Sequence, residues 1–244
     1  MMTKPFKIPK TADASAWLRV TLGDNHSSGT LADHLPKPFA AYARILHPAK
    51  KEGATGKESV SWQTVAEANG TKVHRLMQWP NIAKVDFQAT RPTKANAPWN
   101  RIPSEGNLPS GIAATLVSIL RQFTVTPESC WFTVWDGYGF DDKPWMQAAP
   151  SVNINGQGYR LFTGSIEVAT ASFYDFPDLP YLANMWWPDD HAWFVISHID
   201  LQSTYVGGSE AAVEAILNES QLEAFQAFVD DEDTLGSDLV NTAD

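Results

Sequence analysis

The stretch NMWWPDDHAWFVISHIDLQSTYVGGSEAAVEAIL (residues 184–217) holds extended and helical patterns in direct succession. Residues 193–199 are almost continuously apolar, as in a strand that is covered on both faces. Ser209 can cap a helix that runs through Leu217, and Glu210 is favourable in the first turn because it lies near the positive end of the helix dipole. This stretch therefore predicts a buried strand and a helix that follows it.

The flanking sequence extends this prediction to a mixed fold. Residues 39–46 and 131–135 have the length and apolar character of strands. Apolar residues recur at helical spacing over 112–123, and Ser220 with Glu223 matches a capping box that predicts a second helix near the C-terminus. The sequence thus predicts an α+β fold, with a mixed or antiparallel sheet, a few helices and a helical C-terminus.

The 244 residues, 43% of them hydrophobic, are enough for one domain with a core of its own. Residues 1–35 mix polar residues and glycine with little periodicity, so we expect a polar, partly mobile leader. Residues 36–229 would form a single α+β domain. The acidic run that begins at residue 230 predicts a solvated acidic tail over residues 230–244.

Charge is divided unevenly along the chain. Residues 1–101 carry 15 Lys and Arg against 7 Asp and Glu, whereas residues 102–244 carry 3 against 21. Either the two halves pack together and reduce their self-repulsion, or a bipolar surface recognises a charged partner. The net charge of -10 argues against nucleic acid as a partner. Contact through the basic front half, with Trp79 and Trp99 stacking on bases, stays open as a third interpretation.

The chain has one cysteine, Cys130, so no disulfide can form within it, and we expect a reducing, cytoplasmic setting. The most apolar stretch, residues 111–120, is about half of the roughly 20 residues that a membrane span needs. Residues 1–10 lack the hydrophobic core of an export signal. We expect a soluble protein with no membrane partner.

A tryptophan doublet, Trp186 and Trp187, is the strongest candidate for binding. Adjacent residues on an extended segment point to opposite faces, so one indole could enter the core while the other faces outward as a binding platform. The acidic pair that follows would then lie beside it, although core packing and a simple turn explain the same residues. The predicted binding face comprises Trp186, Trp187, Asp189, Asp190, Thr204, Tyr205, Gly207 and Gly208.

Three residues are candidates for catalysis. His198 and Asp200 are two apart on a predicted strand, hence roughly 7 Å apart on one face, where the carboxylate could orient the imidazole as a general base. Asp190 could pair with Asp200 as the two carboxylates of a glycosidase. His191, His198 and Asp200 have acceptable metal-ligand types but no diagnostic spacing, so no metal is expected. A core histidine and an acidic turn are the simpler alternatives.

Gly207 and Gly208 precede Ser209 at the start of the predicted helix, where free amides could cradle an anion. The neighbouring acidic residues and the absence of any Lys or Arg after Arg160 favour a plain turn into the helix. No nucleotide-binding glycine fingerprint occurs, and we expect no cofactor.

Two motifs, TPESCWFTVWDGYG (residues 126–139) and the part of the opening stretch over residues 184–208, resemble a family of mainly actinobacterial proteins with no known activity. The resemblance covers residues 126–217 and implies a bacterial, cytoplasmic protein and no particular chemistry. In the family pattern, an arginine is usual at the position of His191 and a glutamate at that of His198. The positions that match the motif are Trp187, Asp189, Asp190, Trp193, Asp200, Thr204, Tyr205 and Gly207.

These observations predict a non-catalytic binding or interaction module that uses an acidic, Trp-bearing face. The expected partner is a basic protein or a small polar ligand. The alternative is a carboxylate- or metal-dependent hydrolase, with glycosides as one substrate class, in which Asp190, His198 and Asp200 would share a cleft.

Overall fold

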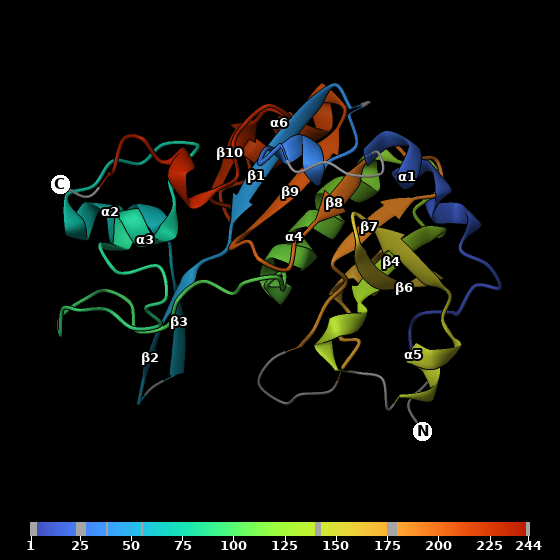
Figure 1. Cartoon of the computed structure of the whole chain (residues 1–244), viewed down its shortest axis with the longest axis horizontal. Helices are drawn as coiled ribbons and strands as arrows, with labels where there is room; N and C mark the ends of the chain where they lie inside the picture. The colour runs from blue at the N-terminus through green and yellow to red at the C-terminus, as the bar shows by residue number, and fades with distance from the viewer. Residues whose placement is uncertain are drawn as a thin grey trace.

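A computed structural model describes residues 4–22, 28–37, 39–54, 56–139, 143–174 and 180–242. These residues form an eight-stranded sheet in the order β10-β1-β9-β8-β7-β4-β6-β5, in which every neighbouring pair is antiparallel (Figure 1). Helices accompany the sheet, and the predicted α+β class is confirmed.

The strands of the sheet are β1 (Ala41–Leu46), β4 (Cys130–Trp135), β5 (Ser151–Ile154), β6 (Gln157–Gly164), β7 (Met185–Pro188), β8 (Phe194–Ile196), β9 (Ser203–Gly208) and β10 (Ala224–Ala227). A separate hairpin is formed by β2 (Ala49–Gly53) and β3 (Gly56–Val60). The α-helices are α1 (Ala16–Leu22), α2 (Trp62–Asn69), α3 (Trp79–Ala83), α4 (Ser110–Leu120), α5 (Pro144–Ala148) and α6 (Glu210–Leu217). The 3-10 helices are η1 (Asp13–Ser15), η2 (Leu31–Asp33), η3 (Arg121–Phe123), η4 (Asp136–Tyr138), η5 (Ile166–Thr170) and η6 (Leu235–Ser237).

One face of the sheet is covered by α4 and α6. The apolar stripe of α4, which includes Ile112 and Leu116, packs with Val213 and Ile216 of α6 against strand residues such as Trp186. The sequence pattern predicted both helices, and the Ser209 hydroxyl caps α6 by accepting from the Ala212 N–H (3.2 Å). Burial of this stripe holds both helices on the sheet.

The other face is covered by the N-terminal residues. Leu18 and Leu22 of α1, with Leu31 and Leu35, pack against strand residues that include Trp187. The prediction that residues 1–35 lie outside the folded core is therefore wrong for their described part, since their leucines supply the apolar cover that this face needs. Residues 1–3 and 23–27, where mobility was also predicted, lie outside the described residues.

A smaller lobe lies beside the sheet and contains β2, β3, α2 and α3, to the left in Figure 1. Its core is aromatic: Trp62, Trp79 and Trp99 are each at most 2% exposed and stack edge to face in sequence. The interpretation in which Trp79 and Trp99 stack on nucleic-acid bases is wrong, because both indoles are used in this core.

The prediction of a second C-terminal helix from Ser220 and Glu223 is wrong. The Glu223 carboxylate instead accepts from the backbone N–H groups of Trp62 and Gln63 (2.7 Å each), so it caps α2 and not a helix of its own. The residues that follow form β10, which pairs with β1 at the edge of the sheet.

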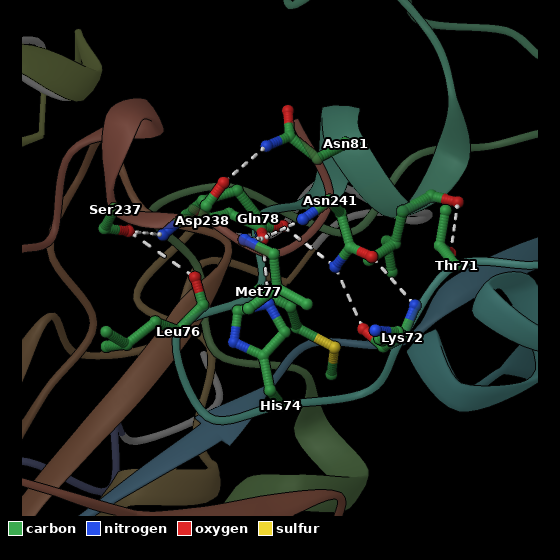
Figure 2. Close-up of polar contacts among 12 residues, drawn as sticks. Thr71, Lys72, His74, Leu76, Met77, Gln78, Asn81, Ser237, Asp238 and Asn241 are labelled. Atoms are coloured by element: carbon green, nitrogen blue, oxygen red, sulfur yellow. Dashed lines mark hydrogen bonds and ion pairs between the residues drawn. The ribbon is translucent and has the colours of Figure 1, made fainter. Parts of the chain in front are cut away.

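The C-terminal segment, residues 230–242, is packed on the smaller lobe, so the prediction of a solvated tail is wrong for these residues. Asp231 is 8% exposed and forms an ion pair with Arg75, and Asp238 is 1% exposed. Figure 2 shows Asp238 beside His74 and Gln78, whose ring Nε2 (2.8 Å) and backbone N–H (3.1 Å) contact its carboxylate. These contacts join basic and acidic halves, as the first explanation of the charge asymmetry expects.

Candidate functional site

The tryptophan doublet does not provide an exposed platform. Trp186 is 1% exposed and Trp187 is 0% exposed, since each face of the sheet has its own cover. The acidic pair beside it has structural partners: Asp189 Oδ1 accepts from the Trp131 indole N–H (2.9 Å), and Asp190 Oδ2 accepts from the Val125 N–H (2.8 Å). The predicted Trp-bearing face is therefore wrong at its centre.

The remaining predicted binding residues are buried in β9. Thr204 Oγ1 lies 2.8 Å from His47 Nε2 and 2.6 Å from Ser197 Oγ, inside a buried polar network. Gly207 and Gly208 are the last residues of β9, so these two positions form neither the anion cradle that was considered nor the plain turn that was favoured. A Cβ on Gly207 would come within 2.6 Å of the Phe39 ring, which explains the glycine as a packing requirement.

The three catalytic candidates do not share a cleft. Asp190 precedes β8 and His198 follows it, so they lie at opposite ends of that strand. His198 and Asp200 do meet, with 3.8 Å between Nδ1 and Oδ2. His191 stacks on Trp17 with 4.4 Å between ring centroids, and the described residues contain no group of three side chains suited to holding a metal ion. The hydrolase site built on Asp190 and the metal site built on His191 are wrong.

An open cavity lies between the sheet and the smaller lobe. This space, which we call the Arg44 cavity, has a volume of about 580 Å³. Strands β1 and β9 form one wall, α2 and α3 another, and residues 233–235 of the C-terminal segment a third. The lining residues used below are Arg44, Trp62, Trp79, Glu105, Asp200, Ser203, Tyr205 and Asp233.

Arg44 is the cation of this cavity, and it is only 5% exposed. Its Nη1 donates to the backbone carbonyls of Arg75 (2.9 Å) and Met77 (3.0 Å), and its Nε donates to Ser203 Oγ (3.2 Å). The guanidinium lies 5.6 Å from the centre of the Trp62 ring. Among the described residues, none accepts a hydrogen bond from Nη2, and no carboxylate lies within ion-pair distance of Arg44.

Acidic groups also line the Arg44 cavity. Glu105 and Asp200 are exposed at its rim, whereas the Asp233 side chain is 9% exposed. Partial desolvation, and then the charge on Asp200, raise the pKa of Glu105. The contribution of Asp200 indicates that the two rim carboxylates repel each other.

Gly106 holds the two rim carboxylates together. Its N–H donates to the Leu201 carbonyl (3.0 Å), its φ is +67°, and a Cβ there would lie 2.5 Å from the Ile199 carbonyl oxygen. Only glycine permits so close an approach at positive φ. The loop that carries Glu105 is thereby fixed against the turn that carries Asp200.

A second cavity of about 380 Å³ adjoins the first, and Asp233 lines both. His34 Nε2 lies 2.8 Å from Asp233 Oδ2, and the His34 and His198 rings are 4.2 Å apart between centroids. Burial, and then the charge on His34, lower the pKa of His198 to about 4. The Asp200 N–H lies 3.4 Å from His198 Nδ1, which is accordingly the accepting nitrogen of a neutral ring.

The sequence analysis identified Asp200, Tyr205 and His198 as candidates but missed Arg44 and Asp233. Arg44 carries a usable signal, because a charged residue inside the apolar strand 39–46 must find polar partners when it is buried. Asp233 carries none, since it lies in an acidic run that resembles a solvated tail.

No protein-family model, curated protein or solved structure matches this chain. Within the described residues, no helix combines the length and the apolar character needed to cross a membrane. The chemistry of the two cavities is therefore the basis for any functional assignment.

Proposed function

We propose that the protein is a non-catalytic binding protein for a small polar ligand, and that this ligand occupies the Arg44 cavity. The observation that carries the proposal is the guanidinium of Arg44, which lines the cavity, is only 5% exposed and has no described carboxylate within ion-pair distance. A buried cation that lacks a counter-ion is costly. A ligand oxygen, above all that of a carboxylate, would stabilise it.

The form of the cavity supports a small ligand. A volume of about 580 Å³ lies within the range of small-molecule sites, which is on the order of 300 to 1,000 Å³. Trp62 and Trp79 give it an apolar wall, and the Trp79 indole N–H is a buried donor with no described partner. A basic protein partner is less well supported, because the aromatic residues that would anchor it, Trp186 and Trp187, are buried.

The proposal is tested by thermal unfolding with a panel of small carboxylic acids, phosphate and amino acids. A ligand at ten times its Kd adds about 1.4 kcal/mol, which corresponds to a rise in Tm of roughly 3 to 6 °C for a chain of this size. The rise should be lost in Arg44→Met and reduced in Arg44→Lys. It should persist in Arg121→Met, which removes a half-exposed arginine paired with Glu128 and Glu167. Equal shifts in all four proteins, or none in any, would overturn the proposal.

A second candidate, a metal-independent hydrolase, is favoured by the pairing of His34 with Asp233. The carboxylate fixes Nε2 (2.8 Å) and leaves Nδ1, which has no hydrogen bond among the described residues, to take a proton from water. Nitrophenyl esters, phosphates and glycosides test this function. Turnover that is lost in His34→Ala and kept in His74→Ala would support it, and no turnover by the unmodified protein would exclude these reactions.

A further inference from the structure

We infer that the ligand of the Arg44 cavity is a small zwitterion, with a carboxylate that pairs with Arg44 and a cationic amine that faces Glu105 and Asp200. The inference rests on the proposed function and adds the chemical class of the ligand. Its basis is the separation of charge within one cavity, in which a single buried cation and several carboxylates line the same space without pairing with each other.

The carboxylates of the cavity lack a strong cationic partner. In the described part of the chain, no Lys or Arg lies within ion-pair distance of Glu105, Asp200 or Asp233. Asp233 bonds His34, and Asp200 is 3.8 Å from the imidazole of His198. The lowered pKa of His198 keeps that ring neutral near pH 7, so it does not balance the charge of Asp200. The exposed rim carboxylates Glu105 and Asp200 therefore present negative potential to the ligand.

The cation is held away from these carboxylates by its own hydrogen bonds. Two carbonyls of the 75–77 segment and Ser203 Oγ fix three of the guanidinium's N–H donors, and the Trp62 ring lies against it. Arg44 therefore has little freedom to turn toward Glu105 or Asp200. A ligand that contacts both Arg44 and the carboxylates must therefore bring its own charge to each.

Electrostatic complementarity selects among ligand classes. A simple carboxylate would pair with Arg44 but would be repelled by the three carboxylates of the cavity. A simple amine would be attracted by these carboxylates but repelled by Arg44. A zwitterion offers a carboxylate to Arg44 and an amine to the carboxylates. Gly106 strengthens this selection because it keeps Glu105 and Asp200 side by side at the rim.

Isothermal titration with matched probes tests the inference. The zwitterions are glycine, L-alanine, 4-aminobutyrate and 6-aminohexanoate. Acetate, propionate, butyrate and hexanoate are the corresponding acids without the amine, and butylamine lacks the carboxylate. We expect at least one zwitterion to bind ~10-fold or more tightly than its matched acid, as for one charge-assisted contact.

The variants separate the two ends of the ligand. Glu105→Gln and Asp200→Asn should each weaken zwitterion binding by ~3-fold or more and leave acid binding unchanged or stronger. Glu58→Gln, an exposed residue of β3 outside the cavity, should change neither. Arg44→Lys should weaken both acids and zwitterions.

The outcomes distinguish this inference from the proposed function. Acids that bind as tightly as zwitterions, with Glu105→Gln and Asp200→Asn unchanged, would overturn the inference and leave the proposed function standing. Binding by butylamine that Arg44→Lys does not alter, or no binding by any probe, would overturn both.

Discussion

His47 is a buried imidazole whose two nitrogens are both hydrogen bonded. Nδ1 lies 2.7 Å from the Ser104 carbonyl oxygen, which can only accept, so Nδ1 carries the proton. Nε2 then accepts from the Thr204 hydroxyl (2.8 Å). Burial is the main reason why the pKa of His47 is lowered to about 4, and the nearby charge of Arg44 lowers it further. The neutral ring is thus part of the native structure.

The lowered pKa of His47 predicts that the folded protein becomes less stable at acidic pH. The folded pKa of about 4 lies below the ordinary value near 6.5, so the unfolded state takes up the proton first. The contribution of neutral His47 to the free energy of unfolding is complete above about pH 6.5 and is lost as the pH falls toward 4. Between pH 7 and pH 5, protonation of His47 in the unfolded state should lower the free energy of unfolding by about 2 kcal/mol. Urea unfolding at the two pH values should show a loss that is smaller by this amount in His47→Gln. Equal losses in the two proteins would contradict the assignment.

Residue patterns predicted some of the site and missed its chemistry. Tyr205 and Asp200 were in the predicted set and do line the Arg44 cavity. Trp187 failed as a platform because strand alternation says that two neighbours face opposite sides but not whether each side is covered. That cover comes from Leu18 and Leu22, far away in the sequence.

At the scale of elements, local periodicity predicted α4, α6, β1 and β4, whose patterns agree with their tertiary contacts. It failed at β10, where a valid capping box was overruled by a long-range contact. Glu223 caps α2, about 160 positions earlier, and the freed segment pairs with β1. A capping residue can serve any helix whose N-terminus comes within reach, and one sequence does not say which.

The C-terminal segment provides the test at this scale. Asp238 accepts from His74 (2.8 Å), the Gln78 N–H (3.1 Å) and the Asn241 N–H (2.9 Å), and these hydrogen bonds lower its pKa despite the opposing effect of burial (Figure 2). Asp238→Ala should cost about 2 to 4 kcal/mol, because it leaves buried donors unpaired.

Urea unfolding measures this cost, and limited proteolysis locates it. Early cleavage should appear within residues 230–242 and near residue 75. Asp230→Ala removes the same charge from an exposed position and should change stability by less than about 0.5 kcal/mol. Equal stability of the two variants would show that the segment is held by other contacts.

At the scale of the whole molecule, Arg44 connects parts of the chain that have separate apolar cores. It belongs to the sheet, donates to carbonyls of residues 75–77 beside the smaller lobe, and lies over Trp62. The C-terminal segment, which follows β10 of the sheet, contacts the 75–77 segment through the Arg75–Asp231 ion pair. A ligand in the Arg44 cavity would touch all three walls, so its binding energy would oppose their separation.

Hydrogen–deuterium exchange tests this coupling with whichever probe binds. Exchange should slow at residues 74–79 and 200–205 and in the C-terminal segment, because opening of the cavity would require release of the ligand. The amides of α4 provide the internal control, since this helix covers the opposite face of the sheet and is outside the lining of the cavity. Protection spread equally over α4 would indicate general stabilisation by the probe. Protection confined to the three walls would locate the ligand between them. The sheet, the smaller lobe and the C-terminal segment would then each contribute to one binding site.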